Sequence, residues 1–227
     1  MIGPGHIFAK TPNQDAFIIR KWKDCTLAVV SDGMGSKPYS HIGSKAACES
    51  VFESIKIWSR SNCLNIVNLL KLIHNIWLIK IAPLKPDDCS ATCLFAFINK
   101  ENEILIAQLG DGLIAILNND NLELLTVEKY DDFSNSTTAL GVAKTLEEWK
   151  YKQFNRFNSD YKLLITTDGI SEDLIESKYK DFINYLHNYS YMSSRARKYR
   201  LSKMLKNWPT RFHNDDKTLV LLHNQNK

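Results

Sequence analysis

Three apolar runs of this chain end in the dipeptide Asp-Gly, and this pattern limits what the chain can fold into. The dipeptides are Asp32-Gly33, Asp111-Gly112 and Asp168-Gly169, and a fourth acidic pair, Asp215-Asp216, stands just before the apolar run 219–222. Apolar runs of this length predict buried strands, so each carboxylate is expected at the end of a strand. Mg²⁺ and Mn²⁺ prefer oxygen ligands, and rigid strand ends can hold such ligands in place. The pattern therefore predicts a metal-dependent enzyme.

An Asp-Gly pair also has a purely structural interpretation. It is the commonest signal for a β-hairpin turn, because a type I′ turn needs positive φ at both central residues. A second apolar run follows Asp111-Gly112 at once, so a hairpin remains an alternative there. After Asp32-Gly33 and Asp168-Gly169 the sequence reads as helix, and hairpin geometry does not apply to these two junctions.

Length and composition favour one globular domain that comprises residues 1–227. A chain of 227 residues with 44% hydrophobic and 24% charged residues can bury a substantial core. The net charge of +4 is mildly basic, and much of the excess lies in residues 195–211. A solvated helix face explains this stretch best, and a surface for an anionic partner or substrate is the alternative. We expect a monomer that binds neither nucleic acid nor membrane.

The five cysteines indicate a reducing compartment. They form no Cys-x-x-Cys pair and no zinc-ligand spacing, their number is odd, and no signal peptide is evident, so free thiols in a cytoplasm are expected. The most apolar helical stretch, residues 64–84, is interrupted by lysine, histidine and asparagine. Its apolar residues form one stripe, which predicts a buried helix rather than a membrane span.

The order of the patterns favours an α+β fold over strict βαβ alternation. Two helices are expected around 47–58 and 64–84, with a turn near Asn62 between them. Two more are expected at 171–189 and 195–207. Residues 130–158 show no regular pattern. The expected strands are 16–21, 25–31, 92–98, 104–109, 113–117, 122–126, 162–167 and 218–223.

Short motifs run through the whole chain in a recognisable order. They are Asn13-Gln-Asp15-Ala, Ser31-Asp32-Gly33-Met34-Gly35, Asp88-Cys-Ser-Ala-Thr92, Gly110-Asp111-Gly112, Thr138-Ala-Leu-Gly141, Thr167-Asp168-Gly169-Ile170 and Asp215-Asp216-Lys-Thr218. Each motif is weak alone, but together and in this order they resemble those of the metal-dependent protein phosphatase 2C family, and its compact bacterial serine/threonine phosphatase subgroup most closely.

The resemblance implies a four-layer αββα sandwich, in which two antiparallel sheets are flanked by helix pairs and metal ions bind in a cleft at one edge. By motif position, Asp32 would bridge two ions, and the Gly33 carbonyl would ligate one of them. Asp168 and Asp215 would complete the first ion's ligands, and Asp15 would support the cluster. Asp111 with Asp168 would form a third, weaker site. The ions would be Mn²⁺ or Mg²⁺, two or possibly three in number.

The implied reaction is hydrolysis of a phosphoserine or phosphothreonine ester in a phosphorylated protein, with a cognate serine/threonine kinase as its counterpart in signalling. The catalytic residues would be Asp32, Asp168 and Asp215. Two ions roughly 3.5–4 Å apart can share a bridging hydroxide that attacks phosphorus, so no protein nucleophile is needed. Without cations, so many converging carboxylates would repel one another and take up protons.

Two departures from the family pattern leave alternatives open. Lys10 stands where the family has a phosphate-binding arginine, with His6 as a further candidate for contacting the substrate phosphate, and Gln14 replaces the usual glutamate. Lysine offers a point charge rather than a bidentate fork. These departures motivate a catalytically weak family member that binds phosphoproteins. The carboxylates and the basic helix motivate a third hypothesis, an unrelated two-metal phosphodiesterase.

Overall fold

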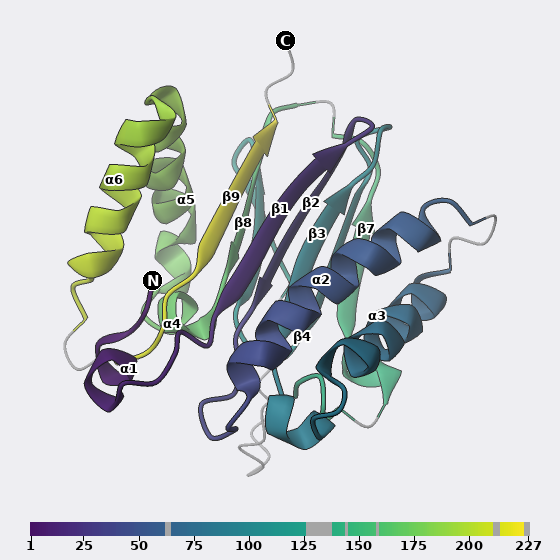
Figure 1. The fold of residues 1–227 in the computed structure, drawn as a ribbon. Coiled ribbons are helices and arrows are strands. Elements are labelled where there is room, and N and C mark those ends of the chain that lie inside the picture. Colours follow the sequence, from purple (N-terminus) through teal and green to yellow (C-terminus); the bar gives the residue numbers. More distant parts are fainter. Residues whose placement is uncertain (62–64, 126–137, 144, 158, 211–213, 225–227) are drawn as a thin grey trace.

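The protein is a four-layer αββα sandwich, as the resemblance implied (Figure 1). The computed structural model describes the chain except for residues 62–64, 126–137, 144, 158, 211–213 and 225–227. Two antiparallel sheets pack face to face, and a helix pair covers each outer face. Three apolar clusters fill the spaces between the four layers. The fold therefore has a core between the sheets and one beneath each helix pair.

The first sheet has five strands in the order β1-β2-β3-β4-β7. Its three central strands are buried almost throughout, because they are covered on both faces, and this explains their continuous apolar runs. The two edge strands are more polar and more exposed. The strands are β1 (Ala16–Trp22), β2 (Cys25–Ser31), β3 (Cys93–Ile98), β4 (Ile104–Leu109) and β7 (Lys150–Phe154).

The second sheet has four strands in the order β6-β5-β8-β9. Strands β5 and β8 are central and buried, whereas β6 and β9 form the edges. The strands are β5 (Leu113–Asn118), β6 (Asn121–Leu125), β8 (Tyr161–Thr166) and β9 (Leu219–Asn224).

Helices α2 (Ser40–Trp58) and α3 (Ile66–Ile81) cover the five-stranded sheet (Figure 1). A close approach near the start of α2 fixes how this helix sits. A Cβ atom at Gly43 would lie 1.7 Å from the carbonyl oxygen of Cys89, so only glycine fits against the 3-10 turn Pro86–Cys89. The indole of Trp77 donates a hydrogen bond to the Gly43 carbonyl at 3.0 Å. The predicted turn at Asn62 lies outside the described residues.

Helices α5 (Tyr179–Asn188) and α6 (Ser194–Lys206) cover the four-stranded sheet. The prediction of one helix over 171–189 was wrong. The chain forms a single-turn helix α4 (Asp168–Ser171), then a 3-10 turn at Glu176–Lys178, and only then α5. Between α4 and that turn, the Asp173 carboxylate accepts a hydrogen bond from the indole of Trp208 at 2.7 Å, a tertiary contact that local periodicity cannot reveal.

Two further elements have no counterpart in the sequence patterns. Helix α1 (Pro4–Ala9) has no buried residue, so it shows no apolar stripe. Strand β7 lies within the stretch 130–158, and as an edge strand with exposed lysines it lacks an apolar run. Helix α6 likewise buries no residue fully, and its basic side chains are mostly exposed, which confirms the solvated face.

The described cysteines are free. Cys89, at the end of the 3-10 turn, and Cys93, the first residue of β3, both pack in the core. None of the described helices combines the length and the apolar character needed to cross a lipid bilayer.

Candidate metal centre

Antiparallel pairing brings four of the predicted carboxylates to one end of the sandwich. Strand β1 pairs with β2 so that Ala16 lies opposite Ser31, and the residues just outside this pair are Asp15 and Asp32. In the other sheet Thr166 lies opposite Leu219, so the segments that carry Asp168 and Asp215 leave the sheet side by side. The start of one strand thus meets the end of its neighbour in each sheet.

Asp32, Asp168 and Asp215 form the tightest acidic group among the described residues. Each offers a carboxylate oxygen, and these oxygens all lie within 4.8 Å of one another. The chemistry of this donor set, three hard oxygen ligands from strand ends, fits a divalent cation such as Mg²⁺ or Mn²⁺.

The main chain of Asp32 is held by Thr92, which immediately precedes β3. The amide of Asp32 donates to Thr92 Oγ1 at 2.9 Å, and the amide of Thr92 donates to the Asp32 carbonyl at 2.7 Å. The hydroxyl of Ser31 donates to the Thr92 carbonyl at 2.5 Å. The motif that ends at Thr92 therefore acts as a clamp on the Asp32 backbone.

Asp15 lies behind this group and connects the two sheets. It is buried, and its Oδ2 accepts a hydrogen bond from Thr167 Oγ1 at 3.0 Å, while Thr167 Oγ1 accepts one from the amide of Thr218 at 3.1 Å. Its other oxygen, Oδ1, is buried and has no hydrogen-bond partner among the described residues. A buried carboxylate oxygen without a donor fits a role beside a bound cation.

The carboxylates of the cluster repel one another, and a bound cation would reduce this repulsion. The pKa of Asp15 and that of Asp168 are both raised to about 6, first by burial and, for Asp168, next by the nearby charge of Asp111. The pKa of Asp32 is well above its ordinary value, first because of burial and then because of Asp15 and Asp168. Cations would offset this repulsion and keep the carboxylates ionised.

Asp111 does not sit in a β-hairpin, so that alternative was wrong. Strand β4 before it belongs to the five-stranded sheet, and β5 after it belongs to the four-stranded sheet. The turn therefore crosses between the sheets, and φ is positive at both glycines, +91° at Gly110 and +113° at Gly112. The side chain of Gln108 donates to the carbonyls of Gly110 at 3.0 Å and Gly112 at 3.3 Å. This turn carries Asp111 close enough to Asp168 to raise its pKa.

Gly33 follows Asp32 in a tightly packed loop. Its amide donates to the Gln14 carbonyl at 3.2 Å. A Cβ atom at this position would lie 2.7 Å from the carbonyl carbon and oxygen of Ser40 at the start of α2. The backbone of Gly33 is thus fixed beside Asp32, and its role as a carbonyl ligand stays a prediction.

Asp216, the partner of Asp215 in the acidic pair, faces the opposite way and was missed as a site residue. Its carboxylate is buried and accepts hydrogen bonds from the amides of Gly3 and Gln14, both at 2.6 Å. His6 Nδ1 lies 2.9 Å from Oδ2 of Asp216. Successive residues of an extended chain point to opposite sides, which was the signal that only one of the two carboxylates could join the cluster.

The two predicted phosphate contacts both lie at the N-terminal helix. His6 is held at Asp216, while Lys10 ends α1 in a left-handed conformation with φ of 57°. Lys217 is a further cation that sequence reasoning missed. It is buried, removal from water lowers its pKa, and its Nζ donates to the Asp215 carbonyl at 3.2 Å.

Comparison with known proteins identifies the family. The family model of protein phosphatase 2C matches residues 2–208 of the chain. No curated protein sequence is significantly similar to this chain.

Solved structures share the fold across almost the whole chain. The S. agalactiae serine/threonine phosphatase has a TM-score of 0.65 at 18% identity, covering 95% of this chain and 94% of that chain. A bacterial serine phosphatase has a TM-score of 0.62 at 21% identity, covering 94% and 92%. RsbX in complex with magnesium has a TM-score of 0.58 at 14% identity, covering 93% and 87%. The chain belongs to the protein phosphatase 2C family of metal-dependent serine/threonine phosphatases.

Proposed function

We propose that Asp32, Asp168 and Asp215 hold two divalent cations, Mn²⁺ or Mg²⁺, and that phosphoserine and phosphothreonine esters of a protein substrate are hydrolysed there. The observation that carries this proposal is the convergence of three carboxylate oxygens within 4.8 Å at one end of a rigid sandwich. Asp15 would support the pair of ions from behind. Asp111, which acts on Asp168 through its charge, would contribute to a third and weaker site.

The chain's own residues would hold the cations and keep the ligand-bearing segments in place. Cations at such a site activate a water for attack on phosphorus and offset the charge on the phosphoryl oxygens. The carboxylates supply the hard oxygen ligands, and the Thr92 and Thr167 contacts hold the segments that carry them. Preorganised ligands of this kind lose little freedom when a metal binds.

Lys10 is the candidate for orienting the substrate phosphate. It is exposed at the end of α1, and the helix is anchored to the segment of Asp215 through the hydrogen bond from the amide of Gly5 to the Asn214 carbonyl at 3.1 Å. His6 uses Nδ1 at Asp216, which leaves Nε2 to contact a phosphate. We further propose that residues 1–227 act as one phosphatase domain, a cytoplasmic monomer that opposes a cognate serine/threonine kinase.

The test is hydrolysis of para-nitrophenyl phosphate and of a phosphothreonine peptide after removal of metal with EDTA and titration with Mn²⁺. Asp32→Ala and Asp168→Ala should each reduce turnover by at least about a hundredfold, because each removes a ligand of the cluster. In EDTA their melting temperatures should stay near that of the wild type or rise, since a repelling charge is lost from the cluster.

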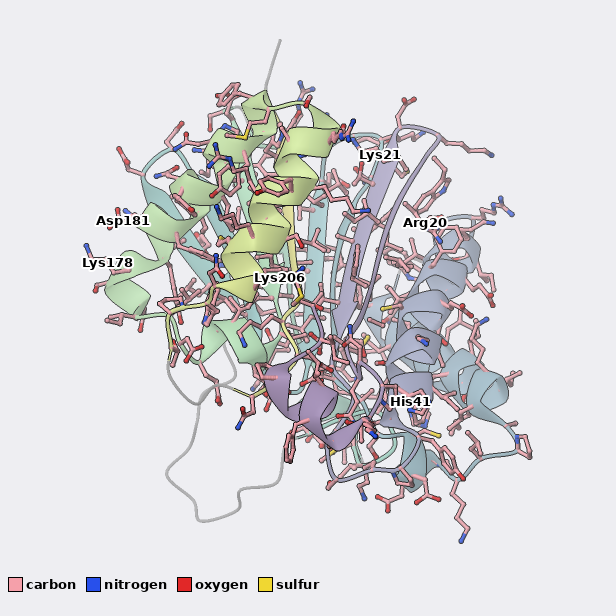
Figure 2. The ribbon with its side chains drawn as sticks, turned by 60° about the vertical axis from the view of Figure 1, so that its left-hand side comes forward. Arg20, Lys21, His41, Lys178, Asp181 and Lys206 are labelled. Atoms are coloured by element: carbon pink, nitrogen blue, oxygen red, sulfur yellow. The ribbon has the colours of Figure 1, made fainter. Side chains whose placement is uncertain are left out.

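Asp181→Ala is the matched control, because Asp181 is an exposed aspartate on α5, paired with Lys178 at 3.0 Å (Figure 2). It should leave turnover unchanged. Near-wild-type turnover in either cluster variant would contradict the assignment. Binding of the phosphopeptide by the wild type without any Mn²⁺-dependent turnover would instead favour a phosphoprotein-binding role.

A further inference from the structure

Strand β9 has an open edge. It pairs with β8 on one side, and within the described part of the chain no strand pairs with its other side. The amide of Thr167 donates to the Thr218 carbonyl at 3.1 Å, so the even-numbered residues of this segment direct their backbone groups towards β8. Leu219, Leu221 and His223 therefore direct their amides and carbonyls outwards. Such a row of backbone groups is a template for another strand.

The first position along this edge shows the geometry that such a strand would adopt. Met1 and Lys217 exchange two hydrogen bonds, from the Met1 amine to the Lys217 carbonyl at 2.7 Å and from the Lys217 amide to the Met1 carbonyl at 2.8 Å. This reciprocal pair is the hydrogen-bonded rung of an antiparallel ladder. The next rungs of the same ladder are those of Leu219, Leu221 and His223.

A groove of about 540 Å³ follows the open edge and has room for an extended chain. All six residues of β9 line it. Ile19 and Lys21 of β1 border one side, and Arg197 and Leu201 of α6 border the other. Figure 1 shows β9 between α6 and β1, and Figure 2 labels Lys21 on β1.

The groove is cationic at one end. Lys21 and Arg197 line it, and their charges, with that of Lys162, contribute to lowering the pKa of His223, for which burial is the first cause. Asp24 is the only carboxylate among the described residues that line it. An occupant with carboxylate side chains would therefore complement this charge.

The groove also offers apolar contact on the β1 side. Ile19 of β1 lines the groove and is 40% exposed, and Phe17, which shares this face of β1 outside the groove lining, is 57% exposed. Alternate side chains of an added strand would point towards this face, and the others towards α6. The expected occupant therefore alternates apolar and acidic residues.

We propose that the open edge of β9 binds an extended, acidic segment of a partner protein as an additional antiparallel strand. Backbone hydrogen bonds to Leu219, Leu221 and His223 would supply affinity, and carboxylates near Arg197 would supply specificity, as in other cases of strand addition. This surface runs along β9 away from the acidic cluster, so the proposal does not depend on the assigned metal ligands.

The test uses a fluorescein-labelled, acetylated peptide of four Glu-Val repeats and the full-length protein in a polarisation assay. Saturable binding is expected for this peptide, and at least about tenfold weaker binding for a peptide of four Lys-Val repeats. A Glu-Val peptide N-methylated at two of its glutamates should also bind at least about tenfold more weakly. Leu219 and Leu221 pack on the side of α6, so the glutamates that face α6 are the residues whose amides point at the β9 edge, and an N-methylated amide cannot donate.

Matched variants assign the binding to the groove. Arg197→Glu should weaken binding of the Glu-Val peptide by about tenfold or more, while Lys198→Glu, at the exposed neighbouring position outside the groove, should change it less than twofold. Hydrolysis of para-nitrophenyl phosphate should be unchanged in both. Equal affinity for the N-methylated peptide, equal effects of the two variants, or no binding of the Glu-Val peptide would each overturn the proposal.

Discussion

At the scale of single residues, Asp216 connects the parts of the site. Its buried carboxylate accepts hydrogen bonds from the amides of Gly3 and Gln14. Gln14 is next to Asp15 in the sequence and Asp216 is next to Asp215, so this contact joins two segments that carry cluster residues. We expect Asp216→Ala to lower the free energy of unfolding by about 3 kcal/mol, because it leaves buried donors without a partner. Mn²⁺ affinity, measured by calorimetry, should fall by about tenfold because two ligand-bearing segments lose their common anchor.

Conservative changes separate this positioning role from simple packing. Asp216→Asn retains one acceptor oxygen and should recover part of both losses, whereas His6→Ala removes one contact and should lower the free energy of unfolding by about 1 kcal/mol. If Asp216→Ala unfolded at the same denaturant concentration as the wild type, the anchoring role would be wrong.

Substitutions of Lys10 test whether this lysine binds the substrate phosphate in place of the family's arginine. Its side chain is exposed, so Lys10→Ala should hardly change stability. If it binds the substrate phosphate, Lys10→Ala should raise KM by about tenfold with little change in kcat, and Lys10→Arg should keep or lower KM because a guanidinium can pair with two phosphate oxygens. Steady-state kinetics with KM unchanged in Lys10→Ala would remove this lysine from the site.

At the scale of elements, the turn between β4 and β5 decides whether Asp111 has a role beyond shape. Asp111→Asn keeps a residue that suits the turn but removes a charge that acts on Asp168. We expect kcat at subsaturating Mn²⁺ to fall by about tenfold while the melting temperature stays close to that of the wild type. Unaltered kcat across a full Mn²⁺ titration would leave Asp111 with a purely structural role.

The elements also show where sequence patterns are informative. Strands β2 to β5 and β8 are covered on both faces, so they carry continuous apolar runs that could be predicted. Edge strand β7 and helix α1 bury too little to leave a pattern. The break between α4 and α5 coincides with the contact from Trp208 to Asp173, which joins distant parts of the chain.

At the scale of the whole molecule, the convergence of the acidic residues depends on topology. Strand-end carboxylates could be recognised one by one, but their meeting at one end requires the pairing of β1 with β2 and of β8 with β9. Asp111 was ambiguous because a hairpin and a crossing between sheets use the same Asp-Gly sequence. The roles of Asp216 and Lys217 depend on burial by the N-terminal segment, which no local pattern encodes.

The same convergence makes the metal-free protein sensitive to pH. In the folded state the pKa of Asp15 and of Asp168 is about 6, against roughly 3.9 for an unfolded aspartate. Below about pH 4 both states are protonated, and the contribution to stability is fully present. As the pH rises, the unfolded chain ionises first, so this contribution is lost between about pH 4 and pH 6. In EDTA, we therefore expect the cluster to destabilise the protein at pH 7 by an amount on the order of 5 kcal/mol, because each of the two raised pKa values contributes roughly 2.6 kcal/mol.

Comparison with Asp32→Asn isolates the contribution of the cluster from that of all other titrating groups. In EDTA the variant should be more stable than the wild type at pH 7, and this difference should shrink to near zero at about pH 3.5, because there the carboxylate is protonated in both the folded and the unfolded state. Excess Mn²⁺ at pH 7 should reverse the order, since cations bind the ionised wild-type cluster and stabilise only the folded state. Denaturant unfolding at the two pH values measures all of these differences, and a wild type that is more stable than Asp32→Asn in EDTA at pH 7 would show that the carboxylates do not repel one another in the folded protein.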